Sequence, residues 1–392
     1  MKPFRSQCIR YIIYSKLFIE NQNLATTYKY LFKRLLKTTV AKKNKLNKLQ
    51  SRRIKQNHNK RLDSKKNSAI DWDQDSLGPL ESGTVISRYG QHADVEDSDG
   101  KILLCDIRRT IKSLICGDKI LWRRAKTIDT TTQNARQGVI EAVQDRDSIL
   151  TRPDFYDGVK PIAANINQII IVSAILPDFT PNIIDRYLVA SEDVEINPVI
   201  LLNKIDLMDE QLSQKQRQEI EKFQQIYQSI GYDFHMISNQ SGHGIDNLQD
   251  ILSDKINIFV GQSGVGKSSL TNSLLPDSNI STKEVSENSR LGQHTTTVAR
   301  LYHFPNGGEL IDSPGIREFG LWHLDPDRVT WCFKEFRQYL GTCKFRDCKH
   351  KNDPGCSIRE AVEQGHIHQE RYDSYHRIIQ SMEENKPNHN RQ

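Results

Sequence analysis

The hydrophobic pattern of residues 160–325 consists of short apolar runs separated by longer segments in which apolar residues recur every three or four positions. The short runs are typical of buried strands and occur at 168–172, 198–202, 234–238 and 256–260. The helical spacing occurs at 183–190, 211–229 and 269–275. Strands that alternate with helices predict a doubly wound sheet, so we assign residues 160–325 to one α/β domain.

Residues 78–154 have a different pattern, in which short stretches alternate apolar and polar positions between turn residues. Five strands are predicted, at 84–86, 93–95, 102–104, 117–122 and 138–143. Asp97-Ser98-Asp99-Gly100 marks a hairpin between the second and third of them. Five short strands in this length favour an OB-fold β-barrel, a fold that often binds nucleic acid. The alternative is a barrel that only packs on its neighbours, because one fold hosts many functions.

Neither end of the chain has a strand pattern. Residues 326–392 carry apolar side chains at helical spacing and predict a C-terminal helical domain. Residues 1–77 have apolar patches without a regular period and are predicted to be a disordered N-terminal arm. From Val40 the sequence becomes strongly basic, and we expect the natural start of the protein at or near this residue.

The net charge of +6 hides a marked asymmetry between the arm and the rest of the chain. Residues 1–70 contain 19 Lys and Arg against 2 Asp and Glu, a net charge of +17, whereas the remainder carries −11. A basic arm on an acidic body indicates a nucleic-acid partner, although a solvated tail is the alternative. No run approaches the ~20 apolar residues of a membrane span, and residues 11–19 lack the cleavage site of a signal peptide. We therefore expect no membrane association.

Three of the seven cysteines lie close together near the C-terminus. An odd cysteine count argues against a fully paired secreted framework and favours a reducing, cytoplasmic compartment. The pattern C-x₄-C-x-H-x₅-C is formed by Cys343, Cys348, His350 and Cys356. Three sulfur ligands and one nitrogen ligand suit tetrahedral Zn²⁺ and leave no position for water, so we predict one structural zinc.

The run 256–260 is followed by the strongest motif in the chain. It reads Gly261-Gln262-Ser263-Gly264-Val265-Gly266-Lys267-Ser268-Ser269 and opens a predicted helix. G-x-x-x-x-G-K-S between a strand and a helix predicts a phosphate-binding loop, whose backbone N–H groups and helix N-terminus bind phosphate oxygens. Lys267 is expected to reach the outer phosphates, and the Ser268 hydroxyl to bind Mg²⁺.

Two further motifs follow predicted strands. Asn203-Lys204-Ile205-Asp206 predicts guanine recognition, because the Asp206 carboxylate can accept hydrogen bonds from N1–H and the 2-amino group. Asp312-Ser313-Pro314-Gly315 places a carboxylate near Mg²⁺ and the Gly315 N–H near the γ-phosphate. Between the phosphate loop and Asp312, Thr296 is expected to complete the Mg²⁺ shell. Asn203 and Asp206 together disfavour the alternative of an ATP-dependent enzyme.

The order of these motifs is unusual, because Asn203 precedes the phosphate loop instead of following Asp312. The same parts in rotated order predict a circularly permuted GTPase domain, which is tolerated when the original termini lie close together. With its flanking domains, the chain resembles the RsgA (YjeQ) family of small ribosomal subunit biogenesis GTPases over about residues 40 to 380.

The resemblance implies rRNA contact by the barrel and a guanine-contacting loop that begins at Ser238. Here Asn239 follows Ser238, where the family usually has Ala or Ser. Ile316 stands where many GTPases have a glutamine that orients the attacking water. We therefore expect His294 to take this catalytic role, and the alternative is a histidine that only shapes its loop. The catalytic residues are then His294, Lys267 and Thr296.

We favour a cytoplasmic, monomeric GTPase that binds the small ribosomal subunit and its rRNA and uses GTP hydrolysis to time its own release. The alternative is a zinc- and OB-fold RNA-binding protein whose GTP site is sensory. The expected GTP-binding residues are Asn203, Lys204, Asp206, Ser238, Gly261, Gln262, Ser263, Gly264, Val265, Gly266, Lys267, Ser268, Ser269, Asp312 and Gly315. The expected Mg²⁺ ligands are Ser268, Thr296 and Asp312, and GTP and GDP are the expected nucleotides.

Overall fold

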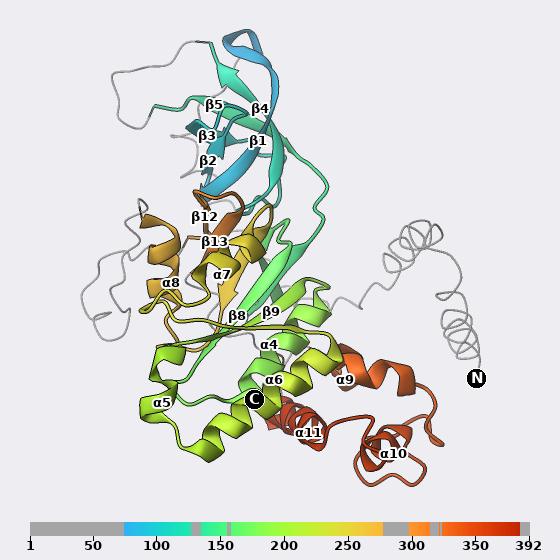
Figure 1. Ribbon diagram of the computed structural model, residues 1–392. Coiled ribbons are helices and arrows are strands. Elements are labelled where there is room, and N and C mark those ends of the chain that lie inside the picture. The colour runs from blue at the N-terminus through green and yellow to red at the C-terminus, as the bar shows by residue number, and fades with distance from the viewer. Residues whose placement is uncertain are drawn as a thin grey trace, which may run out of the picture. The chain divides into compact units, whose positions relative to one another are not determined.

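The computed structural model of the protein describes residues 74–126, 135–154, 158–276, 298–313, 321 and 324–384 (Figure 1). His294, Thr296, Gly315, Ile316 and the basic arm lie outside these residues. In the described part of the chain, no helix combines the length and the apolar character needed to cross a membrane.

The first five strands form a closed barrel, after a short 3₁₀ turn η2 (Gln74–Ser76). They are β1 (Leu77–Tyr89), β2 (His92–Glu96), β3 (Ile102–Ile107), β4 (Lys119–Ala125) and β5 (Gly138–Val143). Their order is β1-β2-β3-β5-β4, and β4 pairs back onto β1, while only the β3–β5 pair is parallel. The fully buried Trp122 and Val95 lie in its core. This topology confirms the predicted OB-fold barrel.

A two-stranded antiparallel ribbon follows the barrel and leads into the α/β domain. It consists of β6 (Ile149–Asp154) and β7 (Gly158–Ala164). Cys116, in the loop before β4, forms an isolated bridge with Ala163 of the ribbon, and the Asn165 side chain donates to the Gly117 carbonyl at 2.8 Å. The hydrophobic pattern did not indicate this ribbon.

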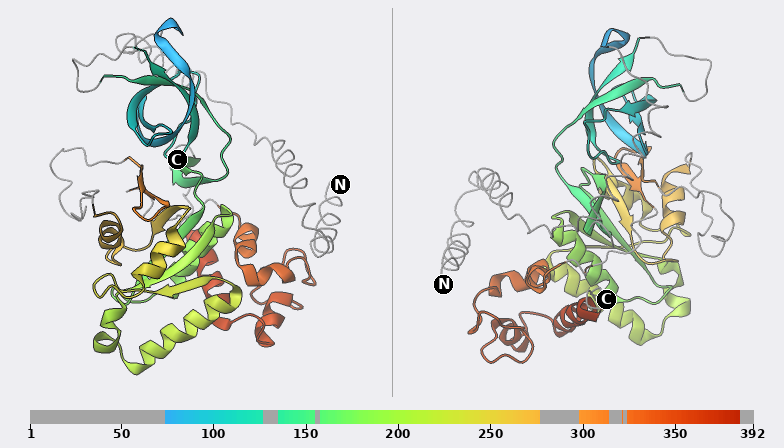
Figure 2. Two further views of the ribbon diagram at one scale, coloured as in Figure 1. Left: turned by 45° about the horizontal axis from the view of Figure 1, so that its top comes forward. Right: turned by 180° about the vertical axis from the view of Figure 1, so that it is seen from behind.

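The α/β domain is built on six strands in the order β10-β9-β8-β11-β13-β12 (Figure 2). All neighbours are parallel except β12 and β13, which are antiparallel. The strands are β8 (Gln168–Ala174), β9 (Asn197–Asn203), β10 (Asp233–Met236), β11 (Ile256–Val260), β12 (Arg300–His303) and β13 (Glu309–Asp312). Strand β11 lies between β8 and β13, although it follows β8, β9 and β10 in the sequence.

Helices cover both faces of this sheet, as expected for a doubly wound domain. On one face, α4 (Pro181–Asp193) and α6 (Gln214–Ile230) pack against apolar residues of β8 and β9. On the other, α7 (Ile245–Leu252) and α8 (Lys267–Leu274) pack against the alternate residues of the same strands. The short η3 (Ile205–Leu207) and α5 (Met208–Gln211) precede α6.

Local sequence explains where α6 begins and ends. Ser213 accepts from the backbone N–H of Gln216, and the Gln216 side chain accepts from Ser213 in return, which forms a capping box. Gly231 ends the helix in the left-handed region with φ of 90°. The helix therefore begins three residues later than the predicted segment 211–229, because the capping residue lies at 213.

The C-terminal residues form a helical domain that packs against α4. It contains α9 (Pro326–Cys332), the 3₁₀ helix η5 (Lys334–Tyr339), α10 (Ser357–Glu363) and α11 (Gln369–Glu384). Its core includes Phe333 and Ile378 together with Val189 and Ala190 of α4.

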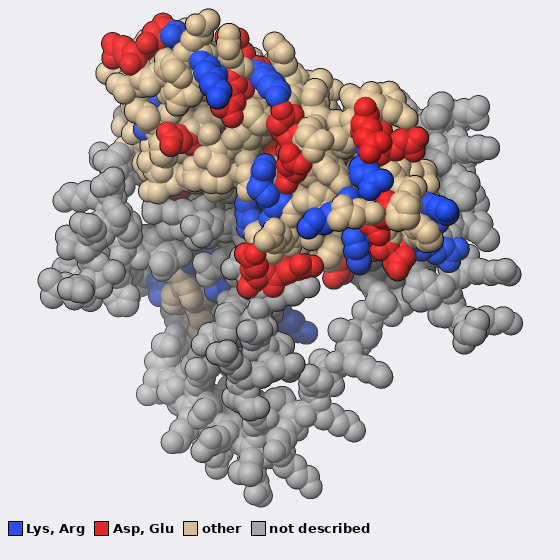
Figure 3. Space-filling view, turned by 90° about the horizontal axis from the view of Figure 1, so that it is seen from below, with Lys and Arg blue, Asp and Glu red and all other residues tan. Residues whose placement is uncertain are grey.

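On the face of the molecule seen in Figure 3, basic and acidic side chains of the described residues are interspersed and do not gather into a basic patch.

A buried ion network joins this domain to α4. Arg371 of α11 is 1% exposed, and its Nε donates to Glu335 Oε1 at 2.6 Å. Its Nη1 pairs with Asp185 of α4, which also accepts from the Tyr227 hydroxyl at 2.9 Å. The guanidinium carbon lies 4.5 Å from the ring centroid of Phe333. One cation therefore compensates two buried carboxylates from different domains.

Candidate nucleotide and metal sites

The phosphate loop connects β11 to α8, as its sequence predicts. Two of its glycines occupy positions that no side chain could share. Gly261 has φ of 143°, and a Cβ there would lie 2.1 Å from the Val172 carbonyl oxygen. Gly266 has φ of 96°, and its Cβ would lie 2.5 Å from Asn203 Nδ2. Glycine is therefore required at both positions for the loop to turn against β8 and the Asn203 loop.

The Lys267 side chain folds over the start of this loop. Its Nζ donates to the carbonyl oxygens of Gly261 and Gln262 at 2.7 and 2.5 Å. The helix α8 begins at Lys267, two residues earlier than predicted. Ser268 and Ser269 of its first turn are exposed, as are Ser263 and Gly264 of the loop. A positive side chain, a helix N-terminus and accessible backbone suit an anionic phosphate chain.

Asn203, at the end of β9, joins three loops at one point. It is 2% exposed, and its Nδ2 donates to the Val265 carbonyl of the phosphate loop at 3.0 Å. Its Oδ1 accepts from the backbone N–H groups of Lys204 at 2.8 Å and Asn239 at 3.4 Å. The predicted guanine motif, the phosphate loop and the loop after β10 are therefore held together by one buried amide.

Lys204 adds a second connection between the same loops. It has φ of 64°, and its Nζ donates to the carbonyl oxygens of Leu176 and Gly264, each at 2.7 Å. Leu176 belongs to the segment that follows β8, which the sequence pattern did not assign to the site. The lysine thus connects the segment after β8 to the phosphate loop.

Asp206 and Ser238 are brought together, as the motifs require. The Ser238 hydroxyl donates to Asp206 Oδ1 at 2.5 Å and accepts from the Ser241 N–H at 3.0 Å. Ser238 is fully buried and lies in the loop beyond β10, which ends at Met236 and not at the predicted residue 238. The hydrogen bond orients the carboxylate that the sequence assigns to guanine.

Asn239, the departure from the usual family pattern, has contacts of its own. Its Nδ2 donates to the Ser269 carbonyl at 3.4 Å, and its Oδ1 accepts from the Ser273 hydroxyl at 2.5 Å. Both partners belong to α8. Asn239 therefore attaches the loop after β10 to the helix that begins at the phosphate loop, a role that no local sequence signal indicates.

Asp312 lies at the end of β13 with its side chain exposed. Because β13 is parallel to β11, the carboxyl ends of the two strands meet at one edge of the sheet. Asp312 therefore lies at the same edge of the sheet as the loop that leads from β11 to the exposed Ser268 of α8. A carboxylate and a hydroxyl are oxygen ligands of the kind that Mg²⁺ prefers.

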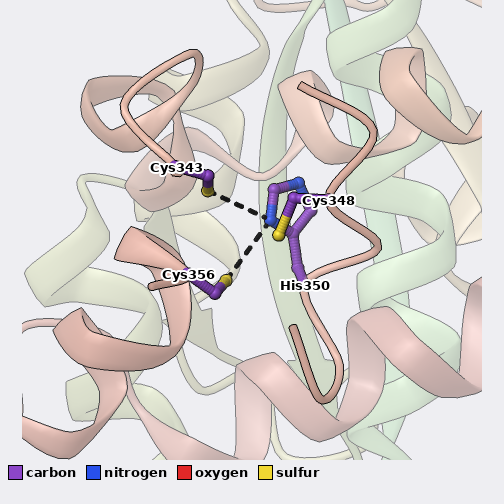
Figure 4. Close-up of side chains that lie close together, drawn as sticks. All are labelled: Cys343, Cys348, His350 and Cys356. Atoms are coloured by element: carbon purple, nitrogen blue, oxygen red, sulfur yellow. Dashed lines mark hydrogen bonds between the residues drawn. The ribbon is translucent and has the colours of Figure 1, made fainter. Parts of the chain in front are cut away.

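The predicted zinc ligands converge in the helical domain. The ligand atoms of Cys343, Cys348, His350 and Cys356 all lie within 4.8 Å of one another (Figure 4). His350 Nδ1 lies 3.6 Å from Cys343 Sγ and 3.5 Å from Cys356 Sγ. Around a tetrahedral Zn²⁺ with ordinary bond lengths, the sulfur–nitrogen separation is about 3.6 Å. The donor set therefore fits zinc in both chemistry and spacing.

Neighbouring elements hold His350 in place. The residue has φ of 57°, and its carbonyl oxygen accepts from the Tyr372 hydroxyl at 2.5 Å and lies 3.0 Å from His376 Nε2, both on α11. Burial lowers the pKa of His350 and so favours its neutral imidazole form. Neutral imidazole is the form that binds a metal.

The chain matches known proteins over most of its length. A family model described as RsgA GTPase matches residues 143–322. The chain is 56% identical over 342 residues to a protein of Sodalis glossinidius named small ribosomal subunit biogenesis GTPase RsgA, and the match spans 87% of this chain and 97% of that protein. A protein of the same name from Yersinia pseudotuberculosis is 57% identical over 347 residues, spanning 88% and 97%. The chain belongs to the RsgA family of small ribosomal subunit biogenesis GTPases.

Two solved structures are similar in fold. YjeQ from Thermotoga maritima has a TM-score of 0.62 at 31% identity, over 78% of this chain and 98% of that one. YloQ, described as a circularly permuted GTPase, has a TM-score of 0.61 at 26% identity, over 82% and 99%. The predicted family, the permuted GTPase domain, the barrel and the zinc-type cluster are thus confirmed, and the purely RNA-binding alternative is not favoured.

Proposed function

We propose that this chain binds GTP at the site around Asn203 and hydrolyses it on the small ribosomal subunit, so that hydrolysis times its own release during late maturation. The observation that carries the proposal is the buried Asn203 amide, which joins a guanine-type motif to a phosphate loop. A site that recognises base and phosphates together needs these loops at a fixed spacing, and the Lys204 contacts add to that constraint.

Each part of the site has a proposed role. Asp206, oriented by Ser238, accepts hydrogen bonds from guanine, and adenine would leave this acceptor without its matched donors. The loop from Gly261 to Ser269 surrounds the phosphates, with Lys267 on their outer oxygens. Ser268 and Asp312 would bind the Mg²⁺ that accompanies GTP, with Thr296 as a third ligand. Gly315 is proposed to donate its N–H to the γ-phosphate.

The group that orients the attacking water is proposed to be His294, because Ile316 cannot serve. General-base or positioning help from such a group contributes about 10²- to 10⁴-fold. Low turnover in the free protein, raised by the subunit, follows naturally when such a group must be brought into place.

The remaining domains are proposed to bind rRNA. The basic segment 40–70 would supply the phosphate contacts, because it is rich in Lys and Arg. One structural Zn²⁺ would hold the loop between Cys343 and Cys356 and thereby fix the fold of the helical domain. We further propose a monomeric, cytoplasmic protein without a membrane partner, with domains at 78–154, 160–325 and 326–392 after the arm 1–77.

The test is nucleotide turnover by the purified full chain with small subunits, with large subunits and alone. We expect GTP hydrolysis that small subunits stimulate and large subunits do not, and no comparable turnover of ATP. A matched binding measurement with GTP and GDP should show that only the GTP-loaded protein stays on the particle. Equal turnover in all three conditions would contradict the proposed role of the subunit, and absence of hydrolysis would favour the sensory alternative.

A further inference from the structure

The barrel and the α/β sheet are joined by strand pairing at β12. Ser87 of β1 pairs in antiparallel register with Arg300, the first residue of β12. The Ser87 hydroxyl also donates to the carbonyl oxygen of Ala299 at 2.9 Å. The junction is therefore a continuous hydrogen-bonded sheet at this point, and not only a contact between surfaces (Figure 1).

This pairing places four residues in one row across four strands. Asp94 of β2 is opposite Ser87, Ser87 is opposite Arg300, and Arg300 is opposite Asp312 of β13. Neighbouring strands lie about 4.8 Å apart, so the row spans about 15 Å from the barrel to the carboxylate proposed to bind Mg²⁺. Residues directly opposite each other project to the same face of the sheet, which allows their side chains to interact.

Side chains reinforce the row on the barrel side. Arg300 Nη1 lies 3.1 Å from Asp94 Oδ2 and donates to the Tyr89 hydroxyl at 3.2 Å, while the same hydroxyl donates to Asp94 Oδ2 at 3.1 Å. A second contact lies farther along β12, where His303 Nε2 is 2.8 Å from Glu96 Oε1. Both ends of β12 are therefore attached to barrel residues.

Tyr89 is also accessible from outside. The residue is 40% exposed, although its hydroxyl is engaged by Arg300 and Asp94. An exposed aromatic ring is a surface on which an unpaired RNA base can stack. A base that contacts Tyr89 would therefore contact the group that holds Arg300.

We propose that Arg300 is a positioning residue for GTP hydrolysis, through which RNA contact at Tyr89 of the barrel changes the position of Asp312. The inference rests on the proposed function and adds to it the route by which the particle stimulates turnover. Arg300 does not touch nucleotide in this scheme; it links the barrel to the strand that ends at Asp312. Coupling of this kind typically changes a linked equilibrium by five-fold or more.

The test compares Arg300→Gln, Asp94→Asn and the double variant with the wild-type chain. Arg88→Gln is the matched control, because Arg88 lies next to Tyr89 on β1 but donates to the Gly90 and Leu114 carbonyl oxygens within the barrel. Turnover is measured alone and over a range of small-subunit concentrations, and nucleotide affinity is measured separately. Arg300→Lys serves as the conservative variant, because it keeps a cation that can pair with Asp94.

We expect each single variant to lose at least about five-fold in subunit-stimulated kcat. Nucleotide affinity and turnover without subunits should stay at wild-type values. The double variant should lose no more than either single one, Arg300→Lys should recover part of the loss, and Arg88→Gln should behave as wild type.

An equal fall in stimulated and unstimulated turnover would assign Arg300 a merely structural role and overturn the inference. Additive losses in the double variant, or unchanged stimulation in both single variants, would overturn it as well. These outcomes differ from failure of the proposed function, which would appear as a wild-type chain that small subunits do not stimulate and would remove the inference with it.

Discussion

Replacing Arg371 by methionine should detach the helical domain from α4. The substitution keeps much of the side-chain volume but leaves Glu335 without its guanidinium partner and Asp185 with only the Tyr227 hydroxyl. The second oxygen of Asp185 already has no hydrogen-bond partner. Removal of one partner from a buried ion pair typically costs about 3–5 kcal/mol, because the remaining charge is buried and uncompensated.

Amide hydrogen exchange is the appropriate assay, since a chain of several domains need not unfold in a single step. Protection in α11 and in the facing side of α4 should fall by at least about 100-fold, which corresponds to the lower end of that range. Arg377→Met is the matched control, because Arg377 is exposed on the same helix and its loss should change stability by less than about 0.5 kcal/mol.

A triple variant separates charge from packing. Arg371→Met combined with Asp185→Asn and Glu335→Gln removes all three charges, and it should recover most of the lost protection because no bare charge stays buried. Unchanged exchange in Arg371→Met would refute the reasoning, and so would a triple variant as unstable as the single one.

Four further predictions concern the nucleotide site, the metal cluster and the arm. Asp206→Asn should weaken GTP binding and admit xanthosine nucleotides, because the acceptor pair becomes a mixed donor and acceptor; unchanged GTP affinity in a binding titration would contradict the guanine assignment. Cys348→Ala should lose zinc by metal analysis and loosen the helical domain, whereas metal-free wild-type protein would rule the site out. His294→Ala should keep GTP affinity and subunit binding but lose most stimulated turnover, and a wild-type rate would make the residue a loop spacer. Deletion of residues 40–70 should flatten the salt dependence of subunit binding by about 0.7–0.9 in log–log slope per lost phosphate contact, and an unchanged slope would indicate a passive tail.

Local sequence determined most of the fold and part of the site. The strands β8, β9 and β11 were predictable, because a short continuous apolar run is typical of a buried strand. The phosphate loop was predictable from its glycine-rich motif between a strand and a helix. The ribbon of β6 and β7 was not, since Pro153 and Pro161 argue against a strand, and proline is tolerated mainly in edge strands.

Contacts between distant segments could not be predicted from the sequence. Ser87 and Arg300 are more than two hundred positions apart, and nothing in either segment indicates that the barrel adds to the sheet. Likewise, the motif predicted Asn203 as a GTP-binding residue, but it gave no sign that both ends of its amide also join neighbouring loops. Such roles depend on which loops meet, and that is decided by packing of the whole domain.

The permuted strand order has a consequence for synthesis of the chain. Within the α/β domain, strands β8, β9 and β10 emerge from the ribosome first. Strand β11, which pairs with the edge of β8 that β9 leaves open, is made later. At roughly 5–20 residues per second, the apolar edge of β8 stays unpaired for seconds. An unpaired, apolar strand edge is a site for aggregation. The nascent chain therefore has an exposed, aggregation-prone strand edge until β11 is made and pairs with β8.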